Sequence, residues 1–176
     1  MPAPYQQKAV DAIRSSGVEL SPSIVTGLAN LDAAEAAWRS ARDEFLADYE
    51  TYRPRFLAGL ASHEEMLRSG ALRRKAERLG AYADDRLRVV YNAMARGKST
   101  KAIAHRYFKE ALDAAAAVPA YVRPQAYAAA KDANAPDDVA RSYAEAYADA
   151  HAYTNAPAYN LADARAYVAT NAPAYS

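Results

Sequence analysis

The sequence contains no cysteine, so disulfide bonds and thiolate metal sites are excluded. Bulky apolar side chains are also scarce, because the 176 residues include only one tryptophan, three phenylalanines and three methionines. Apolar types make up 52% of the chain, but much of this share is alanine, which buries little area per residue. We therefore expect a thin helical body and not a thick globular core.

Long apolar runs are missing as well. No charged-then-apolar leader opens the sequence, and the longest uncharged run, Leu20 to Leu31, has twelve residues. A membrane-spanning helix needs about twenty. We expect a soluble, non-secreted protein without a membrane span, and the sequence leaves its compartment open, a virion included.

Glycine and β-branched residues are sparse, and no segment alternates as strands do. The sequence therefore predicts an all-α protein, an elongated helical bundle or set of hairpins with an Ala/Tyr/Pro-rich C-terminal arm of short helices. We expect two regions, a helical body over 1–118 and a low-complexity arm over 119–176.

The strongest amphipathic pattern lies in the first third of the chain. Ser21 before Pro22 is typical of a helix N-terminus, and Asp32–Glu35 resembles a capping box that begins the main helix. Apolar residues then recur every seven positions and predict the main core face. Pro54 is expected to end or kink this helix. The core residues are Leu31, Trp38, Phe45 and Tyr52.

Further start and stop signals divide the rest of the body. Ser62, three residues before a glutamate, predicts a helix N-terminus, and Gly70 and Gly80 are expected to interrupt the stretch that follows. Ser99 is expected to cap another helix, which Pro119 stops.

The composition changes after Pro119. Eight of the fourteen tyrosines lie in this arm, and the hexapeptide Thr-Asn-Ala-Pro-Ala-Tyr occurs at 154–159 and 170–175. A residue before proline is pushed out of the helical region, which predicts breaks at Ala135, Ala156 and Ala172. The expected short helices are 125–133, 137–153 and 159–169.

An arm of this composition buries too little area to stay ordered alone. We expect it to pack on its own body or on neighbouring subunits. Tyrosine suits such contacts, since it combines a large ring with a hydrogen-bonding hydroxyl group. The predicted partner-binding residues are Tyr121, Tyr127, Tyr153, Tyr159, Tyr167 and Tyr175.

Charge is unevenly distributed although the net charge is only +1. Residues 68–109 hold twelve bases and three acids, while the segments on either side carry more acids than bases. This basic face suits nucleic acid or an acidic protein surface. Five residues are the candidate nucleic-acid or anion contacts: Arg86, Arg88, Arg96, Lys98 and Lys101.

The segment 95–104 resembles part of a helix-turn-helix module, with a glycine turn followed by a basic helix. The second turn and base-reading helix expected after Phe108 are missing, so a helical hairpin with a basic outer face is the simpler interpretation. Gly97-Lys98-Ser99-Thr100 matches the end of a phosphate-binding loop, but Asn92 stands where that motif requires glycine.

Catalytic and metal-binding patterns are not found. None of the three histidines follows a glutamate at the helical spacing of di-metal sites, and adjacent carboxylates occur where helices are expected to begin. We therefore predict no catalytic residues, metal or cofactor, and a protein that is not an enzyme.

The leading hypothesis is a structural subunit of a larger assembly, such as a virion or phage coat or connector protein or another scaffold. Its partners would be other copies of itself or other subunits, with nucleic acid as a further partner. The alternative is a helix-turn-helix-like regulator that uses residues 84–117. Coating of a lipid or polymer surface is a third hypothesis, and an enzyme with an unrecognised site is a fourth.

Overall fold

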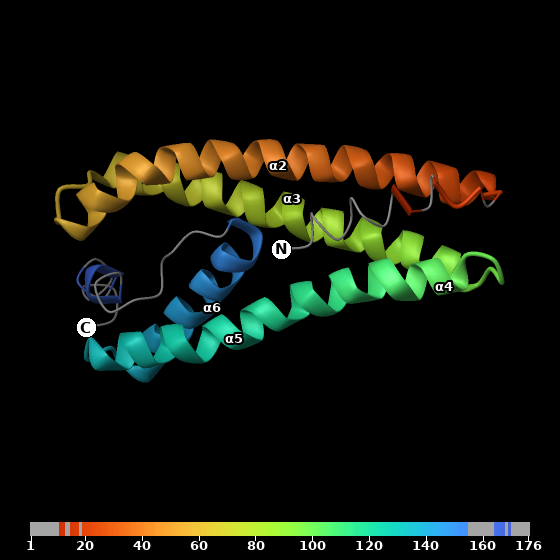
Figure 1. The fold of residues 1–176 in the computed structure, drawn as a ribbon. Coiled ribbons are helices and arrows are strands. Elements are labelled where there is room, and N and C mark those ends of the chain that lie inside the picture. The colour runs from red at the N-terminus through yellow and green to blue at the C-terminus, as the bar shows by residue number, and fades with distance from the viewer. Residues whose placement is uncertain (1–10, 13–14, 18, 155–163, 168, 170–176) are drawn as a thin grey trace. The chain divides into compact units, whose positions relative to one another are not determined.

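Helices make up the fold. The structure, a computed structural model, describes residues 11–12, 15–17, 19–154, 164–167 and 169, and no strand occurs among them. The predicted all-α class is therefore confirmed. The elements, most of them labelled in Figure 1, are α2 (Pro22–Leu57), α3 (His63–Ala95), α4 (Lys101–Ile103), the π-helical segment η1 (Ala104–Lys109), α5 (Glu110–Asp132) and α6 (Asp137–Thr154).

The chain forms two compact units that do not follow its order. The first, here called the hairpin unit, combines Met1–Ala41 with Arg78–Ala116. The second, the tyrosine unit, combines Arg42–Glu77 with Ala117–Ser176. Helices α2, α3 and α5 each contribute a segment to both units. The predicted boundary between residues 118 and 119 therefore falls within a continuous helix.

Helix α2 begins where the Ser21-Pro22 signal predicts. The hydroxyl group of Ser21 accepts the backbone N–H of Ile24 at 3.4 Å. The start predicted at Asp32–Glu35 is wrong, because these residues lie in the helix interior. The earlier turns add a buried face, in which Ile24 is 7% exposed, and this burial keeps them helical.

The helix end predicted at Pro54 and the interruptions predicted at Gly70 and Gly80 are also wrong. Helix α2 continues through Pro54 to Leu57, where Gly59 at a φ of 72° closes it. Helix α3 runs unbroken through Gly70 and Gly80. A glycine costs about 1 kcal/mol in a helix interior, and packing along a helix of this length offsets that cost.

The core of the hairpin unit joins three segments of the chain. Leu31 from α2, Leu87 from α3 and Phe108 from η1 have fully buried side chains in one cluster. Gly27 lies so close to α3 that a Cβ atom there would approach Val90 Cγ2 to 3.1 Å. The helices of this unit therefore lie in close contact. The other members of the cluster are Ile24, Val90, Met94 and Ala104.

Helix α5 passes through two prolines. Pro119 does not stop it, and Pro124 also lies inside it, so the predicted short helix over 125–133 is the second half of a longer one. Each proline removes one backbone hydrogen bond. Both prolines are at least partly exposed, while Val122 and Ala126 between and after them are buried. Burial of this face and the high helix propensity of the surrounding alanines maintain the helix.

The break predicted at Ala135 is confirmed. Asn134 adopts a left-handed conformation with φ 63° and ends α5. The N–H groups of Asn134 and Ala135 donate to the carbonyl groups of Lys131 and Ala130 at 2.9 and 3.0 Å, the bonding pattern of a Schellman motif. Helix α6 then begins at Asp137, as predicted. The breaks predicted at Ala156 and Ala172 lie outside the described residues.

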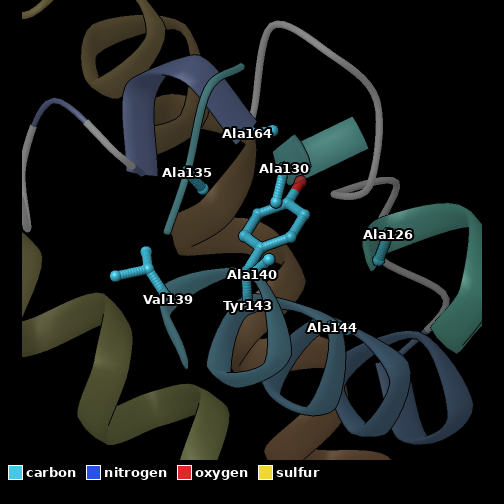
Figure 2. Packing of buried hydrophobic residues seen from close by; sticks show 8 residues of the cluster. All are labelled: Ala126, Ala130, Ala135, Val139, Ala140, Tyr143, Ala144 and Ala164. Carbon is cyan, nitrogen blue, oxygen red and sulfur yellow. The ribbon is translucent and has the colours of Figure 1, made fainter. Parts of the chain in front are cut away.

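A cluster of alanines around one tyrosine forms the core of the tyrosine unit. Tyr143 is fully buried, and Figure 2 shows its side chain rising from α6 toward Ala130 and Ala164. Its ring centroid lies 4.4 Å from that of Tyr147 and 5.2 Å from that of Tyr167. The small alanine side chains let helices approach closely, and the tyrosine rings, which pack at an angle to one another, supply most of the bulk. The cluster comprises Ala126, Ala130, Ala135, Val139, Ala140, Tyr143, Ala144 and Ala164.

Candidate nucleic-acid interface

The candidate interface is built on residues 78–109, here called the basic hairpin, which lie within the hairpin unit. Its turn follows the end of α3 at Ala95. The hydroxyl group of Thr100 is buried and donates to the Met94 carbonyl group at 2.6 Å, which satisfies one of the last carbonyls of α3. A Cβ atom on Gly97 would come within 2.6 Å of Thr100 Oγ1, so glycine leaves room for this bond.

The predicted cap at Ser99 is therefore corrected to Thr100. This residue precedes α4, but its side chain makes no capping hydrogen bond to that helix. It turns back to α3 instead and fixes the reversal of the chain. Met94 before the turn and Ala104 and Phe108 after it belong to one buried cluster, so the two arms of the hairpin pack on each other.

Four of the five predicted contact residues are exposed. None of the four side chains forms an ion pair or hydrogen bond within the described part of the chain. They lie at the end of α3, in the turn and at the start of α4. These residues are Arg88, Arg96, Lys98 and Lys101.

Arg86 is placed differently from the other four. It is only half exposed, its guanidinium carbon lies 5.2 Å from the ring centroid of Tyr82, and its Nε atom is buried without a hydrogen-bond partner. The guanidinium group therefore rests on an aromatic ring as a cation–π pair. The guanidinium group of Arg86 is therefore less accessible to solvent than that of Arg88, two residues further along the helix.

The charge of the hairpin is not balanced within its own sequence. From residue 86 to residue 109 there are seven bases and no acid. In the tyrosine unit, by contrast, most bases have an acidic partner, such as Arg68 with Asp48 at 3.2 Å and Lys75 with Glu44 at 3.4 Å. The hairpin therefore combines clustered positive charge with exposure, as a polyanion-binding surface requires.

Sequence analysis did not select two other residues of this surface, Arg78 and Tyr82. Both are exposed, and their spacing of four residues puts them on one face of α3. The sequence did hold a signal for these two residues. Leu87, Val90 and Met94 mark the buried face of the helix, and the exposed face lies opposite them. A count of charges along the chain does not show which face each residue occupies.

The described tyrosines of the arm make contacts within their own unit. Tyr121 is the exception, with 70% of its surface exposed. Tyr127 donates a hydrogen bond to Asp137, and Tyr167 packs on Tyr143 and Tyr147. Tyr153 is half-buried. The remaining two predicted partner-binding tyrosines, Tyr159 and Tyr175, lie outside the described residues.

The tyrosine unit contains a pocket of about 220 Å³ whose carboxylates are already paired. Arg55 Nε lies 2.9 Å from Glu65 Oε2, and this hydrogen bond lowers the pKa of Glu65 below its usual value. Arg68 pairs with Asp48 in the same pocket. These pairs tie the end of α2 to the beginning of α3.

A second pocket of the tyrosine unit, about 420 Å³, lies between α5 and α6. Asp137 orders one side of it, because this carboxylate accepts the Tyr127 hydroxyl group and lies 2.9 Å from Arg141 Nη2. The hydrogen bond from Tyr127 lowers the pKa of Asp137. The lining residues are Arg123, Pro124, Tyr127, Arg141, Ala144 and Glu145.

The most perturbed carboxyl group belongs to Glu35 in the hairpin unit. Only 3% of the residue is exposed, and burial raises the pKa of Glu35 from 4.5 to about 7. Arg39, 3.7 Å away, partly offsets this effect, while Asp32 and Asp84 add to it. One carboxylate oxygen, Oε1, has no hydrogen-bond partner.

Two further kinds of site are absent from the described part of the chain. No three histidine, aspartate or glutamate side chains gather there in a way that could hold a metal ion. None of its helices combines the length and apolar character needed to span a membrane.

Comparison with known proteins gave no match. No protein family fits the chain, and neither a curated protein nor a solved structure is detectably similar to it.

Proposed function

We propose that this protein is a non-enzymatic structural subunit of a larger assembly and that its basic hairpin contacts nucleic acid. The observation that carries the proposal is the clustered positive charge of residues 86–109, a segment with seven bases and no acid. Phosphate contacts of this kind need only clustered, accessible bases. Arg88, Arg96, Lys98 and Lys101 meet both conditions.

The build of the hairpin favours phosphate contact over sequence-specific recognition. In a helix-turn-helix protein the second helix offers its side chains to base edges. Here Ala104 and Phe108, which follow the turn, are fully buried against α3. The exposed bases are distributed over the end of one helix, the turn and the start of the next, which suits a surface that follows a phosphate backbone.

The role as a subunit draws support from exposed apolar side chains. Tyr121 is 70% exposed at the beginning of the arm, while its neighbour Val122 is 1% exposed. Leu60 and Leu67, near the turn between α2 and α3, are 65% and 57% exposed. A half-buried core tyrosine needs no partner, but a ring that projects this far offers apolar area to a neighbouring chain.

Binding to labelled oligonucleotides tests the nucleic-acid contact. Fluorescence anisotropy at low salt should reveal binding by the full-length protein that weakens steeply as salt is added. The double variant Arg88→Glu/Lys98→Glu should lose at least about tenfold in affinity, since it reverses two exposed charges of the hairpin. The matched control is Arg74→Glu/Arg165→Glu, which makes the same change of net charge at exposed residues of the tyrosine unit.

The two variants separate a local surface from overall charge. Equal losses in both would mean that only net charge matters and would reject the hairpin as the interface. Absence of binding at low salt would reject nucleic acid as the partner altogether.

Light scattering tests the assembly role. The protein alone, or with nucleic acid, should form particles larger than the monomer, and Tyr121→Ser should reduce their size because it removes an exposed ring. A strictly monomeric protein under both conditions would contradict a structural-subunit role.

A further inference from the structure

The outer face of α3 in the basic hairpin carries an aromatic ring among arginines. Arg78, Tyr82 and Val89 follow one another at spacings of four and seven residues, so they form a stripe on one side of α3, and Arg96 follows directly after the helix ends at Ala95. All four are exposed, with values of 50% for Tyr82 and 49% for Val89. The opposite side holds Leu87, Val90 and Met94 in the core.

Contacts within the described part of the chain cover at most one face of the Tyr82 ring. The Arg86 guanidinium group lies 5.2 Å from the ring centroid and orients the ring by a cation–π contact. Tyr82 makes no hydrogen bond and no contact with another aromatic ring within the described residues. The tyrosines of the other unit differ, since Tyr143, Tyr147 and Tyr167 pack on one another.

An oriented, half-exposed aromatic ring beside arginine and lysine side chains has a specific use in nucleic-acid binding. Unpaired bases stack on aromatic side chains while nearby arginines and lysines hold the phosphates. In a duplex the faces of the bases are already covered by their neighbours, so an aromatic ring adds nothing unless the helix is opened. Only a single strand can therefore contact both the Tyr82 ring and the basic side chains of the hairpin.

We infer that Tyr82 is a stacking platform and that the basic hairpin binds single-stranded nucleic acid in preference to duplex. This rests on the proposed nucleic-acid contact and names its substrate class. Arg86 covers one face of the ring, a nucleobase stacks on the other, and Arg78, Arg88 and Arg96 neutralise the adjoining phosphates. An acidic protein segment would use the arginines alone and leave the ring without a role.

The test compares an oligothymidylate strand with a duplex of equal length, both fluorescently labelled, on the full-length protein. The wild type should bind the single strand at least about tenfold more tightly than the duplex, as expected for one or two stacked bases. Tyr82→Leu should remove most of this preference and leave duplex affinity within about twofold of wild type. Tyr82→Phe, which keeps the ring, should retain the preference.

The matched controls make failures distinguishable. Val89→Leu on the same stripe should leave the preference intact, and the fluorescence of Trp38, buried in the same unit, reports whether each variant is folded. Unchanged single-strand affinity in Tyr82→Leu, or equal binding of strand and duplex by the wild type, overturns the stacking role but leaves the phosphate contact standing. Absence of binding to either probe overturns both proposals. Equal competition by polyglutamate overturns nucleic acid as the ligand.

Discussion

Glu35 places an ionisable carboxyl group on the buried, apolar face of α2. Its carboxyl group lies on the α2 face that also carries Leu31 and Trp38, and only 3% of the residue is exposed. Ionisation there is opposed by burial and by Asp32 and Asp84, and Arg39 compensates only in part. The protonated form is therefore favoured in the folded protein up to about pH 7.

Replacing Glu35 with glutamine should stabilise the protein at alkaline pH. The pKa rises from 4.5 to about 7 on folding, so the folded state retains a proton that the unfolded state has lost in this interval. The stability contributed by the protonated group is complete below the unfolded pKa and falls as pH rises toward the folded pKa. The full difference amounts to about 3 kcal/mol, and Glu35→Gln should recover about 1–3 kcal/mol of it near pH 8.

Urea unfolding followed by Trp38 fluorescence across the pH range measures this effect. Wild type and Glu35→Gln should be nearly equally stable near pH 5 and diverge as pH rises. Stability curves that run parallel through this range would show that Glu35 ionises normally.

Thr100 provides a second prediction at this scale. Its buried hydroxyl group donates to the Met94 carbonyl group at 2.6 Å, and Thr100→Val replaces that group with a methyl of similar size. The Met94 carbonyl group still accepts the Gly97 N–H at 3.1 Å, so loss of the Thr100 hydrogen bond should lower stability by about 1 kcal/mol. Thr100→Ser keeps the hydroxyl group and should cost less than Thr100→Val in thermal unfolding. If Thr100→Ser were less stable than Thr100→Val, the methyl group of Thr100 and not its hydroxyl group would be the stabilising part.

At the scale of elements, α5 depends on buried alanines to run through two prolines. Pro124 lacks the N–H that would bond the carbonyl group of Ala120, which makes it the weak point of the helix. Pro124→Ala should restore that bond and raise stability by about 1–3 kcal/mol, with a gain in helical circular dichroism. Ala128→Ser, an exposed position of the same helix, serves as a control and should change stability little. A destabilised Pro124→Ala would mean that the ring packs productively where it lines the pocket between α5 and α6.

The elbow between α5 and α6 depends on one left-handed residue. Asn134→Gly should keep or slightly raise stability, because glycine adopts φ 63° freely. Asn134→Val should cost at least about 1–2 kcal/mol, since a β-branched residue is strained there. Chemical denaturation of the two variants measures this difference in stability. Equal stabilities would show that the backbone between α5 and α6 can change conformation to avoid the strain.

The elements show which parts of this fold were readable in the sequence. The heptad spacing of Leu31, Trp38 and Phe45 predicted the buried face of α2, and all three are at most 2% exposed. The helix boundaries failed wherever a local signal opposed burial. Gly70, Gly80 and Pro119 are helix breakers by propensity, but the long helices on which they lie bury apolar residues after these positions, and sequence alone does not weigh that burial. Examples are Ala76, Leu87 and Val122.

The candidate interface was predictable only in its charge. Counting bases found Arg88, Arg96, Lys98 and Lys101, all of which are exposed, because residues 86–109 contain no acid with which they could pair. Arg86 and Tyr82 required the structure. Whether an arginine projects into solvent or rests on a ring depends on the face it occupies, and that face is set by the core on the other side.

For the whole molecule, the distribution of paired and unpaired bases decides how salt should act on its interactions. The bases of the tyrosine unit are largely paired with its own acids, as with Arg55 and Glu65 at 2.9 Å, so they release few counterions when a polyanion binds. The side chains of Arg88, Arg96, Lys98 and Lys101 in the basic hairpin have no such partners among the described residues. Binding should therefore depend on salt mainly through these four residues.

The slope of affinity against salt measures this division. If Arg88, Arg96, Lys98 and Lys101 each neutralise one phosphate of a single strand, the slope of log K against log salt should be about −3. Arg88→Gln and Lys98→Gln should each reduce its magnitude by about 0.7, and together by about twice that amount. Arg55→Gln removes a paired base of the tyrosine unit and should leave the slope unchanged. Equal effects of Arg55→Gln and Arg88→Gln would mean that internal ion pairs do not protect the paired bases from polyanion contact, and the positive surface would then extend beyond the hairpin.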